Sequence, residues 1–115
     1  MVTLPSWLAA TRIRLDKHPA NGLPFESELV FLATDAGFAG QWRSSQGQPA
    51  ALLGLSSSRH PEGGVALAFV WRTADAGGMG LAHVVQADGS VFCEVVFAGE
   101  GPPGERQLGV ARSAA

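Results

Sequence analysis

The sequence lacks recognisable motifs for metal binding, phosphate binding and catalysis. Its histidines, His18, His60 and His83, do not have the H-x-H or H-x-x-x-H spacing of a metal site, and no glycine-rich segment is followed by a helix-forming stretch that could hold a phosphate. Eight Lys and Arg residues stand against ten Asp and Glu residues, without a basic cluster, for a net charge of −2. We therefore expect no metal, no cofactor, no nucleic-acid partner and no enzymatic activity.

Signals for disulfides, secretion and membrane insertion are also missing. Cys93 is the only cysteine, which excludes an internal disulfide and fits a reducing compartment. The opening MVTLPSWLAA has no positively charged region, and its apolar run is too short for a signal peptide. No stretch of eighteen uninterrupted apolar residues occurs. These absences predict a soluble, cytoplasmic protein with no membrane partner.

What the sequence does contain is a regular series of short apolar segments separated by turns. The segments are rich in Val, Phe, Leu and Trp and are too short for typical helices, which indicates consecutive β-strands. We expect residues 1–115 to form a single all-β domain. The predicted strands cover residues 9–16, 28–34, 37–44, 50–57, 64–73, 79–87, 90–98 and 105–112.

The connections predict how these strands are arranged. Asp88-Gly89 is a two-residue hairpin signal, because a type I′ turn needs positive φ at both central residues. No connection is long enough to carry a crossover helix, so neighbours in sequence should be neighbours in the sheet. Closing such a sheet removes its two edges. We therefore predict an eight-stranded antiparallel up-and-down (meander) barrel, whose interior is either filled by side chains or holds one small ligand.

Both faces of the later strands are apolar. In the segment 64–73, Val65, Leu67, Phe69 and Trp71 alternate with Ala66, Ala68 and Val70. A single-layer barrel with an apolar outer face needs a cover, and another copy of the same chain can supply it. We expect a homodimer or homotetramer joined through the C-terminal half.

Two stretches of the sequence are similar to a known family. LVFLATDAGFAGQWRSSQG contains a hairpin glycine followed by a G-x-W-x-S strand and a polar loop, and it resembles the second and third strands of the avidin and streptavidin family. LLGLSSSRHPEGGVALAFVWRT is similar to that family's next two strands. The resemblance covers residues 29 to 73 and implies an avidin-like or lipocalin-like barrel that binds a small molecule.

The resemblance also implies a set of ligand-binding residues. Trp42 takes the place of a tyrosine whose hydroxyl binds the ureido oxygen of biotin, and Ser44 matches a serine that accepts from a ureido N–H. Trp71 matches a tryptophan of the box around the bicyclic ring. Gln46 and Gln48 fall in the loop that covers the ligand, where they could bind a carboxylate or an amide.

The sequence departs from the family in ways that bear on the ligand. The G-x-W of the first strand and the W-L-L of the last strand are absent, and Trp42 has no hydroxyl. These departures favour a small, largely apolar ligand at one open end of the barrel over biotin itself. Two alternatives remain: a filled barrel, with Trp42 and Trp71 in its core, acting as a homo-oligomeric interaction module, or a small barrel enzyme that uses Glu94 or His83.

Four further residues carry expectations of their own. Trp7 is expected to cap one end of the barrel, and His60, which precedes Pro61, to be a solvated loop residue. Cys93 is expected to be a buried, inert thiol. Glu94 is expected to form an ion pair with Arg72 or Arg43 at a rim or interface.

Overall fold

The chain forms an antiparallel β-barrel, as predicted. The computed structural model describes residues 4–16, 26–44, 49–101 and 105–113, with side chains up to residue 99. Its strands are β1 (Arg12–Asp16), β2 (Ser27–Thr34), β3 (Gly37–Ser44), β4 (Ala50–Arg59), β5 (Val65–Arg72), β6 (Gly77–Ala87), β7 (Ser90–Gly101) and β8 (Glu105–Ser113). None of the described residues belongs to a helix long and apolar enough to cross a membrane.

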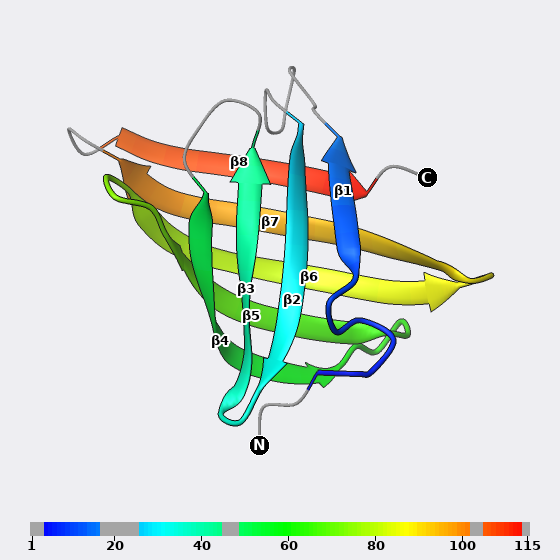
Figure 1. Cartoon of the computed structure of the whole chain (residues 1–115). Coiled ribbons are helices and arrows are strands. Elements are labelled where there is room, and N and C mark those ends of the chain that lie inside the picture. Colours follow the sequence, from blue (N-terminus) through cyan, green and yellow to red (C-terminus); the bar gives the residue numbers. More distant parts are fainter. Residues whose placement is uncertain (1–3, 17–25, 45–48, 102–104, 114–115) are drawn as a thin grey trace.

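Each strand pairs antiparallel with the next, and the barrel closes where β8 returns to β1. That closing contact is short, with Leu15 opposite Ser113 and Asp16 opposite Arg112. In Figure 1, β1, β2 and β3 run upright in front, and β5 to β8 lie across behind them. β4 joins the two layers, and its register shifts between Gly54 and Ser56, as is common where a strand turns from one sheet into another.

The predicted segments match the observed strands closely except at the first. The predicted strand 9–16 begins only at Arg12, because the carbonyl oxygen of Pro5 accepts the backbone N–H groups of Leu8 and Ala9, and Ala10 has a φ of 62°. This tight N-terminal turn buries Leu8 completely and packs Trp7 against the core. Trp7 thus holds the N-terminal turn against the core, and its predicted role as a cap of one barrel end stays a prediction.

The β6–β7 hairpin has the predicted turn. Asp88 and Gly89 have φ angles of 52° and 77°, the positive values that a type I′ turn requires at both central positions. Ala87 pairs with Ser90 on either side of them, so the connection contains two residues. Because this turn matches the natural twist of the flanking strands, β6 and β7 continue as a long regular ribbon.

The inner faces of the strands form an aromatic core. Phe31 and Phe69 are completely buried, and their rings meet edge to face with centroids 5.8 Å apart. Phe38 contacts Phe31 in the same way, at 5.7 Å. Gly80 lies opposite Phe69 on the neighbouring strand β6, and a Cβ at Gly80 would lie 2.3 Å from the Phe69 ring. The glycine thus gives the large ring its space, as dense interior packing requires.

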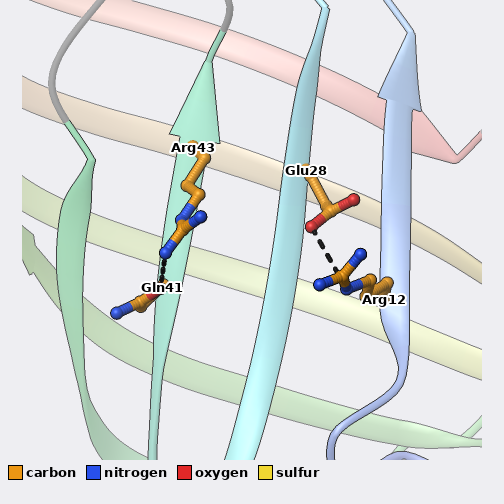
Figure 2. A network of polar contacts seen from close by, with 4 residues as sticks. All are labelled: Arg12, Glu28, Gln41 and Arg43. Carbon is orange, nitrogen blue, oxygen red and sulfur yellow. Dashed lines mark hydrogen bonds and ion pairs between the residues drawn. The ribbon is translucent and has the colours of Figure 1, made fainter.

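The outer face of the front layer is charged. Figure 2 shows Arg12 on β1 reaching Glu28 on β2, with nitrogen and oxygen 3.7 Å apart, and Arg43 on β3 donating to Gln41 at 3.0 Å. Arg14 forms a further ion pair with Glu26, at 3.3 Å. These side chains are exposed, so the pairs add little stability and mark a surface suited to water.

Candidate functional site

The two tryptophans singled out by the sequence lie in contact inside the barrel. Trp42 on β3 and Trp71 on β5 meet edge to face, with ring centroids 5.6 Å apart and planes at 80°. On its other side, Trp42 stacks on Phe97 of β7, with centroids 3.9 Å apart and planes at 10°. The structure thus joins Trp42, Trp71 and Phe97 into one cluster, which we call the tryptophan cluster.

Strand alternation explains why these rings point inward. Phe38, Gly40 and Trp42 share one face of β3, and Trp71 follows Leu67 and Phe69 along the inner face of β5. The Trp71 side chain is fixed by a hydrogen bond, because its indole N–H donates to the carbonyl oxygen of Ala98 at 3.2 Å. Trp71 is buried, whereas Trp42 is only half-buried and is the most exposed ring of the cluster.

Two serines lie beside the tryptophan cluster. Ser27 is the first residue of β2 and pairs with Ser44, the last residue of β3. Two residues further along β2, Leu29 pairs with Trp42. Directly paired residues lie on the same side of the sheet, so both serines share the inner face with Trp42. Ser27 is only 6% exposed, and its hydroxyl has no hydrogen-bond partner among the described residues. A buried hydroxyl in that condition costs free energy unless another group binds it.

Ser27 and Phe97 were not predicted as site residues, although the sequence holds a signal for each. Phe97 follows Cys93 and Val95 in strict alternation, which places all three on one face of β7. Ser27 alternates in the same way with Leu29 and Phe31, but the predicted strand began at residue 28 and left it out. The predicted loop residues Gln46 and Gln48 lie outside the described residues.

The barrel has two different ends. The N-terminal turn packs at the start of β5, where Leu4 and Pro5 share a pocket with Gly64 and Val65. Trp71 lies at the other end of β5. The tryptophan cluster is therefore away from the start of β5, where the N-terminal turn packs.

The prediction for His60 holds in part. His60 lies in the turn that follows β4, as predicted, but its ring is half-buried and stacks on that of His83, with centroids 3.5 Å apart and planes at 14°. The Nε2–H of His83 donates to the carbonyl oxygen of Gly63 at 2.8 Å, and Nδ1 of His60 accepts from the backbone N–H of Glu62 at 3.0 Å. The pair lies on the outside of the barrel, because the neighbours of His83 in β6, Ala82 and Val84, are the buried residues.

Glu94 also lies outside the barrel and is exposed. In the register of β6 and β7 it lies directly opposite His83. An acid or base inside the barrel therefore cannot be supplied by Glu94 or His83. Within the described part of the chain, no group of three His, Cys, Asp or Glu residues is placed to hold a metal ion.

Cys93 is buried in the core, as predicted for an inert thiol. Its pKa is raised from 9.0 to about 12, mainly because burial disfavours the thiolate and further because Glu94 is negatively charged. The reactive form of the thiol is therefore suppressed at neutral pH.

A scan against protein-family models and searches of the curated proteins and of the solved structures find no match to this chain.

Proposed function

We propose that this protein is a small-molecule-binding barrel of the avidin-like or lipocalin-like class, and that it is not an enzyme. Its ligand is small and largely apolar, and it binds at the barrel end formed by Trp42, Trp71, Ser27 and Ser44. The observation that carries the proposal is the buried Ser27 hydroxyl, which has no hydrogen-bond partner among the described residues.

The chemistry of these residues defines the ligand. The half-buried Trp42 presents apolar ring surface, on which a flat ligand can stack. Ser27 and Ser44 place two hydroxyl groups side by side on the same inner face, suited to a single carbonyl, hydroxyl or amide group of the ligand. Sites for small molecules combine mostly apolar walls with a few polar groups in this way.

The avidin-like class suggests how the rest of the ligand is held. In that arrangement Gln46 and Gln48 belong to the covering loop and bind a carboxylate or amide at the outer end of the ligand. Trp42 supplies stacking where the avidin family supplies a hydroxyl, so the polar recognition falls to the serines. This change favours a ligand with less hydrogen-bonding capacity than biotin.

An environment-sensitive apolar dye, 1-anilinonaphthalene-8-sulfonate, tests the site. We expect one dye molecule per chain to bind to the folded protein with a rise in dye fluorescence. Ser44→Glu should weaken that binding by about tenfold or more, because an apolar, anionic ligand would have to approach a carboxylate at the mouth of the site. Ser90→Glu, the same change in the exposed β6–β7 hairpin, should leave the affinity unchanged.

The outer surface of the barrel could bind the same dye, and Leu81→Glu on β6 separates the two cases. Leu81 is 61% exposed on the outside of the barrel. If the dye occupies the proposed site, Leu81→Glu retains binding and Ser44→Glu loses it. Loss of binding in Leu81→Glu alone, or no dye bound to the wild type, would overturn the proposal and support a filled barrel.

Ser27→Ala should have opposite effects on stability and on binding. Removing a buried hydroxyl that lacks a partner should leave the free protein as stable as the wild type or stabilise it by about 1 kcal/mol. The same change should weaken a ligand that hydrogen-bonds to Ser27. Thermal melts with and without millimolar biotin measure both, because a ligand of micromolar affinity then adds about 4 kcal/mol to stability.

The melts also distinguish a polar, biotin-like ligand from a less polar one. A rise in the melting temperature with biotin that is smaller in Ser27→Ala would support an avidin-like polar site. No rise with biotin would restrict the ligand to less polar molecules. A clear loss of stability in ligand-free Ser27→Ala would show that the hydroxyl serves the fold, and would remove the observation on which the proposal rests.

A further inference from the structure

The outer face of the rear layer exposes several large apolar side chains beside Ser58, His83 and Glu94, in contrast to the charged front layer of Figure 2. The outward residues of β4 to β7 include four large apolar side chains: Leu53 is 62% exposed, Leu81 61%, Met79 51% and Val96 42%. We call this surface the β4–β7 face. None of the described segments covers these four side chains, and apolar clusters of this kind usually mark a site of interaction.

On the β4–β7 face, the outward residues of β5 are smaller than the residues of β6 that lie opposite them. On β5 the outward residues Ala66 and Ala68 are small, and they form the floor of a groove of about 300 Å³ that Leu81 and Val96 border. On β6, Met79 and Leu81 form a ridge beside that groove. Ala68 lies directly opposite Leu81 in the register of the two strands, and Val70 lies directly opposite Met79.

We propose that two copies of this chain pack face to face through the β4–β7 face, about a two-fold axis that runs parallel to the strands between β5 and β6. Such an axis exchanges β5 with β6 of the partner and keeps each residue at its own height along the strands. Because Ala68 and Leu81 are at the same height, each Leu81 enters the groove over the partner's Ala68. The ridge and the groove are thus complementary to each other within one surface, as a symmetric interface requires.

The outer strands of the face fit the same axis, which brings β4 of one copy over β7 of the other. Leu53 and Ala98 occupy the same row, through Val70 and Met79, so the large leucine meets the small alanine of the partner. Ser58 and Glu94 also share a row, through Ala66 and His83. The Ser58 hydroxyl can therefore donate to the carboxylate of the partner's Glu94 at each edge of the interface.

The small size of the face favours a weak dimer. Four strands spaced about 4.8 Å apart are about 19 Å wide, and the outward residues of β6 from Met79 to Val85 extend about 20 Å. The resulting footprint of about 400 Å² is in the range of functional apolar patches and belongs to a small interface. We therefore expect a dimer that forms at high protein concentration and dissociates on dilution.

Sedimentation velocity tests the proposal. At about 100 µM, well above a micromolar dissociation constant, the wild type should sediment with twice the monomer mass of 11.9 kDa. Leu81→Lys and Ala68→Glu should each sediment as monomers, because each places a charge in the contact between ridge and groove. Leu32→Lys is the matched control: Leu32 is 42% exposed on β2, outside the β4–β7 face, so this variant should remain a dimer.

Mixing the two disruptive variants tests the position of the axis. With the proposed axis, a dimer of one Leu81→Lys chain and one Ala68→Glu chain brings the two new charges together and leaves the second Leu81 on an unchanged alanine, so mixing should restore the dimer. Circular dichroism melts establish that each variant is folded. If Ala68→Glu unfolds, Leu81→Lys, which lies at a largely exposed position, still tests whether the dimer forms through the β4–β7 face. A monomeric wild type, a dimeric Leu81→Lys, or folded variants that stay monomeric when mixed would overturn the proposal.

Discussion

Replacing Phe69 by alanine should lower the free energy of unfolding by about 3–5 kcal/mol. Phe69 is completely buried at the centre of the barrel, and its ring contacts Phe31 at 5.8 Å and Phe97 at 6.1 Å between centroids. Removing the ring removes its buried apolar surface and leaves a cavity. The neighbouring side chains can fill this cavity only in part, because they are held in paired strands. Urea unfolding followed by tryptophan fluorescence measures the change.

The contact between Phe69 and Gly80 allows a sharper version of this experiment. Gly80→Ala should destabilise the protein by about 1–3 kcal/mol, because overpacking moves side chains away from their preferred rotamers. The reason is local, since the new Cβ would lie 2.3 Å from the Phe69 ring. In a Phe69→Leu background the smaller side chain leaves room for the methyl group, so Gly80→Ala should cost much less there. Additive effects in this double-mutant cycle would show that the ring does not require the glycine.

Local patterns in the sequence predict much of this fold. In β3, which matches the predicted segment 37–44, the alternation of Phe38, Gly40 and Trp42 correctly gives the inner face. The Asp88-Gly89 turn is predicted for a physical reason that the observed φ angles satisfy. Both are properties of a few consecutive residues, and they depend on backbone sterics alone.

Contacts between distant strands are harder to predict. His60, in the turn after β4, stacks on His83 of β6 across the intervening strand β5, and the register between β4 and β5 shifts between Gly54 and Ser56. A shift of one residue changes which side chains meet. Nothing in the residues around His60 encodes that shift. The partnership of Trp42 with Phe97 depends in the same way on how the two layers of the barrel face each other.

The candidate site contains some features that local sequence patterns predict and others that depend on contacts between distant strands. Alternation placed Trp42 and Trp71 on inner faces, but β5 and β7 carry apolar residues on both faces, so the pattern did not distinguish the tryptophan cluster from the outer surface. Ser27 is recognised as a candidate site residue only from its pairing with Ser44 and its burial in the structure. The alternation of Ser27 with Leu29 and Phe31 gives its face but does not mark it as a site residue, and its significance lies in the hydrogen bond that it does not make within the described residues.

Alkaline pH should destabilise the wild type through Cys93. The pKa of this thiol is raised to about 12 in the folded protein, from the ordinary value of 9.0 that we expect it to have in the unfolded chain. Between these values the unfolded chain releases a proton that the folded protein retains, so stability falls as the pH rises. The loss should be roughly 1 kcal/mol per pH unit. Well below pH 9 the thiol is protonated in both states, and Cys93 should cause little pH dependence.

The composition of the chain makes this slope measurable, because the sequence has no tyrosine and Lys17 is its only lysine. Urea unfolding at pH 8, 10 and 11, repeated on Cys93→Ala, isolates the thiol. The variant should start less stable, because it leaves a small cavity, and should lose less stability than the wild type as the pH rises. Parallel losses in the two proteins would mean that Cys93 ionises with equal ease in the folded and unfolded states. A thiol reagent gives an independent check: the folded protein should react slowly at pH 8 and the urea-unfolded protein quickly, because exposure of the sulfur and formation of the thiolate both require the barrel to open.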